Sequence, residues 1–324
     1  MSISNYIKEI GRGTKGARSL SRAQAADLMG QLLDGQVSDL ELGGFCVAMR
    51  FKGESAQELA GFLDATEQRL PAWPSSANSQ PVVVIPSYNG ARKLPNLTPL
   101  LAALLAREGL PVLVHGCETE NVRISTGAVW QQLGWAQIQS PAAIEPGQKV
   151  WMQTRHLLPA LERLLQVRRL MGLRNPAHSL VKLLDPVRGV PNPSLVLASY
   201  THPDYAQSMA QTLELTSGNA LLLRSTEGEA VASPSREPAS QGVIAGQTVF
   251  TRSALRGEAE IDAVAQKLTV QQTAELTEQI LNGQRPIPAP IATQVLQIKA
   301  LHSAMTSANT ENTAALQAFN RSED

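Results

Sequence analysis

Two adjacent cations follow a strand-end turn in the stretch IPSYNGARK, residues 85–93. The apolar run before the turn predicts a buried strand at 82–85, and Gly90 lies in the turn itself. In α/β proteins such strand ends are where phosphates and nucleotides bind. This turn has one glycine and no acidic residue, and it closes with Arg92 and Lys93. These residue types predict an anion held by charge.

Further basic residues form two groups along a chain whose net charge is zero, with 28 basic and 28 acidic residues. One group lies on a predicted short helix at 4–10 and on the Gly-rich loop after it. The other lies between 155 and 188, where seven Lys or Arg residues accompany two acidic ones. Such groups of basic residues could bind a polyanion, or they could simply form solvated helix faces, so both interpretations stay open. The residues that we expect to contact a polyanion are Lys8, Arg12, Lys15, Arg18, Arg92, Lys93, Arg169, Arg174 and Lys182.

The composition is that of a globular chain of 324 residues, 43% of them hydrophobic, which is long enough for two structural units. Cys46 and Cys117 have no spacing typical of a zinc site or of a disulfide framework, which favours a reducing compartment. The N-terminus has no signal-peptide pattern, and no apolar run reaches the ~18 residues of a membrane span. We therefore expect a soluble, cytoplasmic protein that does not contact a membrane.

Aromatic residues make up only 4% of the chain, so platforms on which bases stack are scarce. The few candidates are Tyr88, Trp130 and Trp151. No zinc-finger, RRM or KH signature occurs in the sequence. Any binding of nucleic acid should therefore rest on the phosphate backbone and show little sequence preference.

A helical module is predicted for residues 1–70. Three Ser-x-x-Glu/Gln capping boxes, which begin at Ser21, Ser38 and Ser55, each precede a run of helical periodicity. A linker rich in turn-forming residues follows at 71–80.

A βαβ unit is predicted after the linker. It consists of the strand at 82–85, a helix with Thr98 as N-cap that runs to Arg107, and a second strand at 110–114. Such a unit implies a right-handed crossover and a parallel sheet. Further strands are predicted at 194–199 and 219–223, and further helices at 125–133, 157–171, from Asn175-Pro176 to about 184, 204–215, 259–281, 291–307 and 311–320.

The order of these motifs resembles the anthranilate phosphoribosyltransferase family, which has the nucleoside phosphorylase/phosphoribosyltransferase fold and belongs to glycosyltransferase family 3. The resemblance rests on VHG after the second strand and on the later segments RRLMGLRNPAHSLVKLLDP and ALLLRSTEGEA. The segments IKEIGRG, DLELGG, IPSYNGARK, NLTPLLA and MGLRNPAH are most similar to the YbiB-like branch. The resemblance to that branch implies that this protein binds nucleic acid.

The resemblance also implies a domain organisation. A small all-helical domain, formed by 1–75 and about 157–187, would mediate dimerisation. A larger α/β domain with a mainly parallel central sheet would comprise about 80–156 and 190–324. Packing of two helical domains would place the basic residues near 8–18 and 163–182 close to a groove between the domains.

The family's catalytic motifs are altered at the matching positions. Pro86–Gly90 stands where the family has the diphosphate loop Gly-Thr-Gly-Gly-Asp, and proline and tyrosine do not suit a cradle for phosphate. Val114 stands where the family has a lysine that contacts diphosphate. Gly228–Val231 stands where the family has the magnesium motif Gly-Leu-Asp-Glu, and the nearby Glu227 and Glu229 are weak substitutes. The arginine that recognises the anthranilate carboxylate is matched by Arg169.

These changes predict a scaffold with no catalytic residue, no metal and no cofactor. We expect a homodimer that binds single-stranded DNA, RNA or both without sequence preference. An enzyme of the same fold with altered motifs is the alternative, and a scaffold protein whose dimer face is functional is a third possibility. We read His115 as a hydrogen-bonded strand-end residue, and Asn89, Gly90 and Asn96 as donors for a residual small-anion site. The former substrate loop comprises Ser87, Tyr88, Asn89, Gly90, His115 and Gly116.

Overall fold

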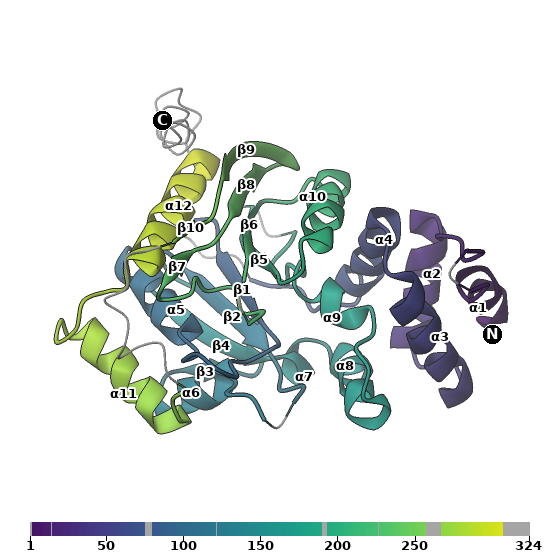
Figure 1. Ribbon diagram of the computed structural model, residues 1–324, viewed down its shortest axis with the longest axis horizontal. Helices are drawn as coiled ribbons and strands as arrows, with labels where there is room; N and C mark the ends of the chain where they lie inside the picture. Colours follow the sequence, from purple (N-terminus) through teal and green to yellow (C-terminus); the bar gives the residue numbers. More distant parts are fainter. Residues whose placement is uncertain are drawn as a thin grey trace.

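The computed structural model describes residues 2–13, 15–74, 80–120, 122–189, 193–225, 227–256 and 267–306. Its first four helices, on the right of Figure 1, are α1 (Ser4–Ile10), α2 (Arg22–Leu33), α3 (Asp39–Lys52) and α4 (Ala56–Glu67). The three predicted capping boxes form at the starts of α2, α3 and α4. In each box the serine side chain accepts a backbone N–H, and the Gln or Glu side chain returns to the serine N–H.

Three later helices lead back to this helical module. They are α7 (Thr154–Leu157), which joins strand β4 (Lys149–Gln153) to the other two, α8 (Pro159–Met171) and α9 (Ala177–Leu180). Helix α8 packs against α2 and α9 packs against α4, so the chain crosses between the two parts of the molecule more than once (Figure 1).

An eight-stranded sheet forms the centre of the α/β part, in the order β3-β4-β2-β1-β5-β6-β8-β9. The six strands from β3 to β6 run parallel, and β8 and β9 pair antiparallel at one edge. A separate antiparallel pair joins β7 (Arg236–Glu237) to β10 (Leu255–Arg256). The strands of the large sheet are β1 (Val83–Ser87), β2 (Val112–Gly116), β3 (Gln137–Ile138), β4 (Lys149–Gln153), β5 (Leu195–Tyr200), β6 (Ala220–Arg224), β8 (Ser240–Ile244) and β9 (Gln247–Arg252).

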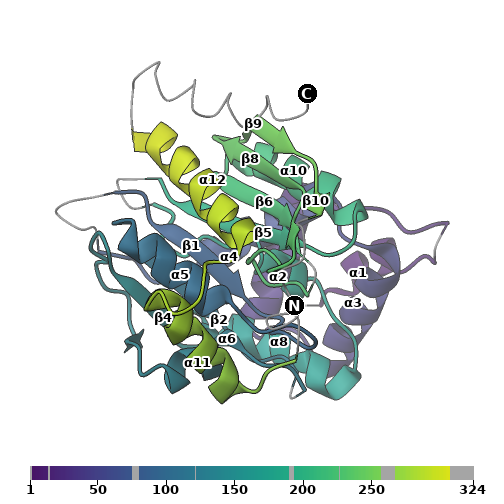
Figure 2. The same cartoon turned by 60° about the vertical axis from the view of Figure 1, so that its left-hand side comes forward.

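Alternation along β1 explains why the sheet is buried on both faces. Val83 and Ile85 belong to one core cluster, which includes residues of the covering helices, while Val84 belongs to the other, which extends into the helical module. Figures 1 and 2 show the helices α5, α6, α11 and α12 on the side away from that module. The covering helices are α5 (Thr98–Arg107), α6 (Thr126–Gln132), α10 (Asp204–Thr216), α11 (Val270–Leu281) and α12 (Ala289–Thr306).

The predicted fold class is confirmed, since a helical module accompanies a larger α/β part with a mainly parallel sheet. Several boundaries differ. The first strand continues to Ser87, and the N-cap of α5 is Leu97, because Asn96 Oδ1 instead accepts the Thr98 N–H at 3.2 Å. Strands β3 and β4 were not predicted. The predicted helix at 311–320 lies outside the described residues. Among the described helices, none is both long enough and apolar enough to cross a membrane.

Candidate functional site

The loop after β1, residues 86–96, is held in place at the carboxyl edge of the sheet. Ala91 and Ile124 form an antiparallel bridge, with N···O distances of 2.9 Å in both directions. Gly90 turns the chain with φ +67°, and a Cβ there would lie 2.8 Å from the Ile124 carbonyl oxygen. Only glycine combines this backbone conformation with so close an approach. The loop is therefore a fixed structure that presents its backbone in one orientation.

A buried carboxylate occupies the centre of this loop. Glu229, on the turn after β6, is 3% exposed and accepts the backbone N–H groups of Asn89 at 2.9 Å and Gly90 at 2.6 Å. The Ser87 hydroxyl also donates to it, and Thr98 Oγ1 lies 3.4 Å away. Converging backbone N–H groups of this kind bind anions. Here the anion is a side chain of the protein itself.

A second carboxylate fixes the part of the loop that carries the two cations. Glu227 accepts the backbone N–H groups of Arg92 at 2.6 Å and Lys93 at 2.8 Å. Arg123 braces the same turn by donating to the Gly90 carbonyl oxygen at 3.2 Å. The side chains of Arg92 and Lys93 are exposed, and they make no hydrogen bond or ion pair with any described residue. Their backbone is fixed while their charges face solvent.

Pro86 and Tyr88 were expected not to suit a cradle for phosphate, and the N–H groups of Asn89 and Gly90 converge on a side chain of the protein instead. Of the donors expected to serve a small anion, these two backbone groups are therefore already used. The Asn96 amide donates to the Ile124 carbonyl oxygen and to Thr126 Oγ1, both at 3.0 Å, while Asn89 Nδ2 has no hydrogen-bond partner among the described residues. Sequence alone underestimated Glu229, because its partners lie about 140 residues away in the chain.

A magnesium ion, which the family resemblance implies, would require carboxylate oxygens free to bind it. Both nearby carboxylates accept backbone N–H groups instead. Within the described part of the chain, no three His, Cys, Asp or Glu side chains are grouped so that they could hold a metal. The residues present therefore do not fit a magnesium site.

Tyr88 and His115 form a buried chain of hydrogen bonds beneath the loop. The Tyr88 oxygen lies 2.7 Å from His115 Nδ1 and accepts from Thr154 Oγ1 at 3.1 Å. Burial lowers the pKa of His115 to about 3, so the ring is neutral and can accept the tyrosine proton. The three candidates for stacking, Tyr88, Trp130 and Trp151, are 4%, 0% and 3% exposed, so none presents an open ring face to solvent.

Removal of the Tyr88 hydroxyl tests this structural role. We expect Tyr88→Phe to lower the free energy of unfolding by about 1–3 kcal/mol, because it removes the buried hydrogen bonds of the hydroxyl with His115 and Thr154. Urea denaturation would measure the loss. Tyr205→Phe, at a residue that is 37% exposed, is the matched control and should change stability little. Equal stability of the two variants would contradict the role of Tyr88.

The predicted basic residues lie in separate places. Arg174 reaches the loop, since its Nη2 donates to Asn89 Oδ1 at 3.1 Å, and Lys182 lines the same cleft between the helical module and the sheet. Lys8, Arg12, Lys15 and Arg18 are exposed, but α1 lies on the far side of the helical module from the sheet (Figures 1 and 2). Within one chain the structure therefore does not bring those four residues to the loop.

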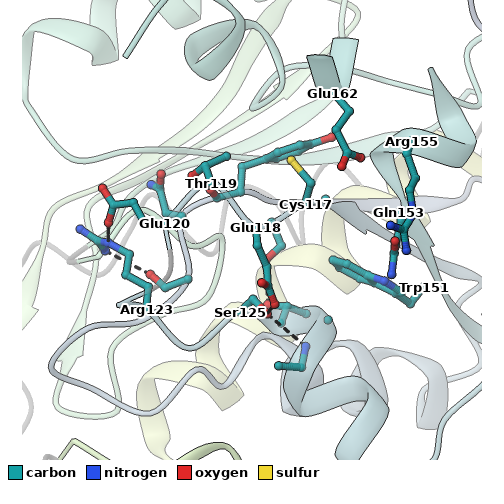
Figure 3. Close-up of a pocket in the computed structure, with 18 of the residues that line it drawn as sticks. Cys117, Glu118, Thr119, Glu120, Arg123, Ser125, Trp151, Gln153, Arg155 and Glu162 are labelled. Carbon is teal, nitrogen blue, oxygen red and sulfur yellow. Dashed lines mark hydrogen bonds and ion pairs between the residues drawn. The ribbon is translucent and has the colours of Figure 1, made fainter. Parts of the chain in front are cut away.

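A cavity of about 420 Å³ adjoins the loop at the ends of β2 and β4 (Figure 3). Its lining carries both signs of charge, with Arg123 paired to Glu120 on one side and Arg155 and Glu162 on the other (Figure 3). Arg169 also lines it and donates to the Glu118 carbonyl oxygen at 3.0 Å. The cavity is large enough for a small polar molecule.

Known proteins share this architecture and parts of this sequence. Residues 4–69 match the model of the helical bundle domain of a glycosyl transferase family. YbiB of Escherichia coli (strain K12), described as uncharacterized, is 38% identical over 299 residues, which are 91% of this chain and 92% of YbiB. Anthranilate phosphoribosyltransferase of Synechococcus sp. (strain JA-3-3Ab) is 29% identical over 241 residues, 72% of this chain and 68% of the enzyme. The crystal structure of that enzyme from Thermus thermophilus has a TM-score of 0.70 at 20% identity and covers 97% of this chain and 94% of its own.

The helical module, the mainly parallel sheet and the loop at its carboxyl edge define a phosphoribosyltransferase scaffold of glycosyltransferase family 3. The similarity to the solved enzyme structures shows the fold, and the sequence similarity to YbiB shows the family. The chain belongs to the YbiB-like family of proteins related to anthranilate phosphoribosyltransferase. The resemblance predicted from the sequence is thereby confirmed.

Proposed function

We propose that this protein binds nucleic acid without sequence preference, on a phosphoribosyltransferase scaffold that has lost its catalytic site. The observation that carries the proposal is the Glu229 carboxylate, which fills the N–H cradle where a diphosphate would bind. A bound diphosphate would have to displace a buried, hydrogen-bonded side chain and would meet its charge. The groups of the loop that remain available to an anionic ligand are the exposed side chains of Arg92 and Lys93.

The phosphate backbone of a single strand is the ligand that this arrangement favours. Exposed cations grip phosphates through charge and counterion release, which is independent of sequence. Titration of labelled single strands of different sequence into the protein, followed by fluorescence anisotropy, tests the proposal. We expect similar, tight affinities for DNA and RNA of mixed sequence. Absence of binding at low salt would contradict the proposal.

An enzyme with altered motifs is the second candidate, and the 420 Å³ cavity beside the loop favours it. A small substrate held there would lie close to the former substrate loop. Incubation with a phosphoribosyl donor, magnesium and a panel of aromatic acceptors tests this candidate. Turnover would support it and contradict the loss of catalysis, whereas we expect none.

We also propose that the protein is a homodimer that pairs through α3. Leu40, Val47 and Phe51 lie on one stripe of this helix at spacings of seven and four residues, and they are 87%, 37% and 75% exposed. A Cβ at Gly43 would meet no atom within 4 Å, so nothing in the described chain covers that part of the stripe. Exposed apolar stripes of this kind mark interfaces. Pairing would repeat the basic loop on both protomers, and two such sites would bind a long strand with higher avidity.

Phe51→Glu tests this interface. A charge buried within the stripe should raise the dimer dissociation constant roughly 100-fold, because the desolvated carboxylate would have no partner. Light scattering over a range of protein concentrations would measure the mass. Leu296→Glu, at a residue of α12 that is 57% exposed, is the matched control and should leave the dimer intact. An unchanged mass for Phe51→Glu would exclude α3 as the interface.

A further inference from the structure

A second cavity, of about 530 Å³, lies between the helical module and the carboxyl edge of the sheet. Its walls come from the end of α3, from the segment 172–182, from the end of β5 and from the start of α10. Cavities of this size hold ligands of the size of a nucleotide. It lies next to the basic loop, because Arg174 lines it and also donates to Asn89.

Most of the cations that line this cavity have no carboxylate partner. Arg50, Arg174 and Lys182 pair with no carboxylate in the described part of the chain, while Arg168 pairs with Glu120. Glu54 is the one acidic residue among the lining residues. Burial lowers the pKa of Lys182 to about 8, with Arg174 adding to the effect and Glu229 opposing it. Burial, together with Arg123 and Arg50, also lowers the pKa of Arg174. Like charges held together in a half-buried site favour a bound anion, which would relieve their repulsion.

Aromatic rings share the cavity with these cations. Tyr200 and Tyr205 line it from β5 and α10, and His202 lies between them in the sequence. Tyr205 is 37% exposed, so its ring is accessible from solvent. His178 is 6% exposed and also lines the cavity, and its Nε2 has no hydrogen-bond partner among the described residues. Tyr200 and Tyr205 therefore offer rings on which a base could stack, in place of the buried Tyr88, Trp130 and Trp151.

We propose that this cavity is a socket for one unpaired nucleotide of the bound strand, with its base against Tyr200 and Tyr205 and its phosphate on Arg174 and Lys182. This inference rests on the proposed function and adds the reason why a single strand would be chosen over a duplex. A base stacks on an aromatic ring whatever its identity, so the socket keeps the lack of sequence preference. A paired base in a duplex cannot enter without unstacking, which costs a few kcal/mol.

The experiment uses AMP as the probe for the socket and calorimetry as the measurement. We expect AMP to bind at least about tenfold more tightly than ribose 5-phosphate, which lacks the base, because stacking is worth ~1–3 kcal/mol per base. Tyr205→Ala should reduce this difference, because only Tyr200 is left to stack on the base, and Tyr205→Phe, which keeps the ring, should retain it. Tyr205 is exposed enough for both variants to fold. Equal binding of AMP and ribose 5-phosphate, or an unchanged AMP affinity in Tyr205→Ala, would overturn the socket.

Competition separates a nucleotide in a strand from a free nucleotide. Saturation with a single-stranded oligonucleotide should abolish AMP binding, and a blunt duplex of equal charge should displace AMP at least about tenfold less effectively. AMP binding that persists under the saturating strand would overturn the socket as part of the strand site. Failure of AMP binding while the oligonucleotide still binds would reject the socket and leave the proposed function intact. Failure of both ligands would reject both.

Discussion

Reversal of the two loop charges, Arg92→Glu together with Lys93→Glu, should lower the affinity for single-stranded nucleic acid roughly 100-fold at low salt. Both side chains are exposed and unpaired within the described chain, and their backbone is fixed by Glu227. The change replaces two attractive contacts with two repulsive ones in each protomer. Anisotropy of a labelled strand would measure the loss. Because the backbone N–H groups remain, the loop itself should keep its structure.

A matched control separates this local effect from a change in net charge. Lys267 and Arg285 are exposed, and in the sequence they precede and follow α11. This helix packs against α5 and α6, on the side of the sheet that faces away from the helical module (Figure 1). Lys267→Glu together with Arg285→Glu alters the net charge by the same amount. We expect this control to weaken binding only about two- to threefold, through the long-range field. Equal losses in the two double variants would mean that the loop has no special role.

Removal of the Glu229 carboxylate should have the largest effect on stability. Glu229→Ala leaves the N–H groups of Asn89 and Gly90 without an acceptor in a buried site and removes one of the two acceptors of the Ser87 hydroxyl, the other being Thr126 Oγ1. Each unsatisfied donor is costly, so we expect the free energy of unfolding to fall by about 3–5 kcal/mol. Denaturant titration would measure this loss.

Inorganic phosphate provides the second readout for Glu229. If the loop is an anion cradle filled by a side chain, phosphate should stabilise Glu229→Ala more than it stabilises the unsubstituted protein. Glu229→Gln, which keeps one acceptor oxygen and the volume, should lose less stability and gain less from phosphate. The same phosphate effect on all three proteins would contradict the view that Glu229 occupies an anion site.

Local signals in the sequence predicted the elements that hold the site. The capping boxes at Ser21, Ser38 and Ser55 fixed three helix starts, because a cap involves residues only three positions apart. The βαβ unit and the exposed turn at Arg92 and Lys93 were also found from short patterns. Strands β3 and β4 were missed, because β3 has two residues and neither strand has a clear apolar alternation.

Long-range contacts account for what the sequence could not predict. The partnership between Glu229 and the loop joins the ends of two parallel strands, β1 and β6, with β5 between them. Glu227 and Glu229, which follow the strand predicted at 219–223, could have indicated this contact, because the carboxyl ends of parallel strands share one edge of the sheet. The burial of Tyr88 was hidden for the same reason, because its partners His115 and Thr154 come from other parts of the chain.

The salt dependence of single-strand binding is the measurement that tests polyanion recognition most directly. We expect log K to fall linearly with log salt concentration, by about 0.7 for each phosphate that the protein neutralises. The neutralised variant Arg92→Gln with Lys93→Gln should give a shallower slope, by roughly 1.4 for each protomer whose loop contacts the strand. Binding that is insensitive to salt, or an identical slope in the variant, would contradict recognition of a polyanion by this loop.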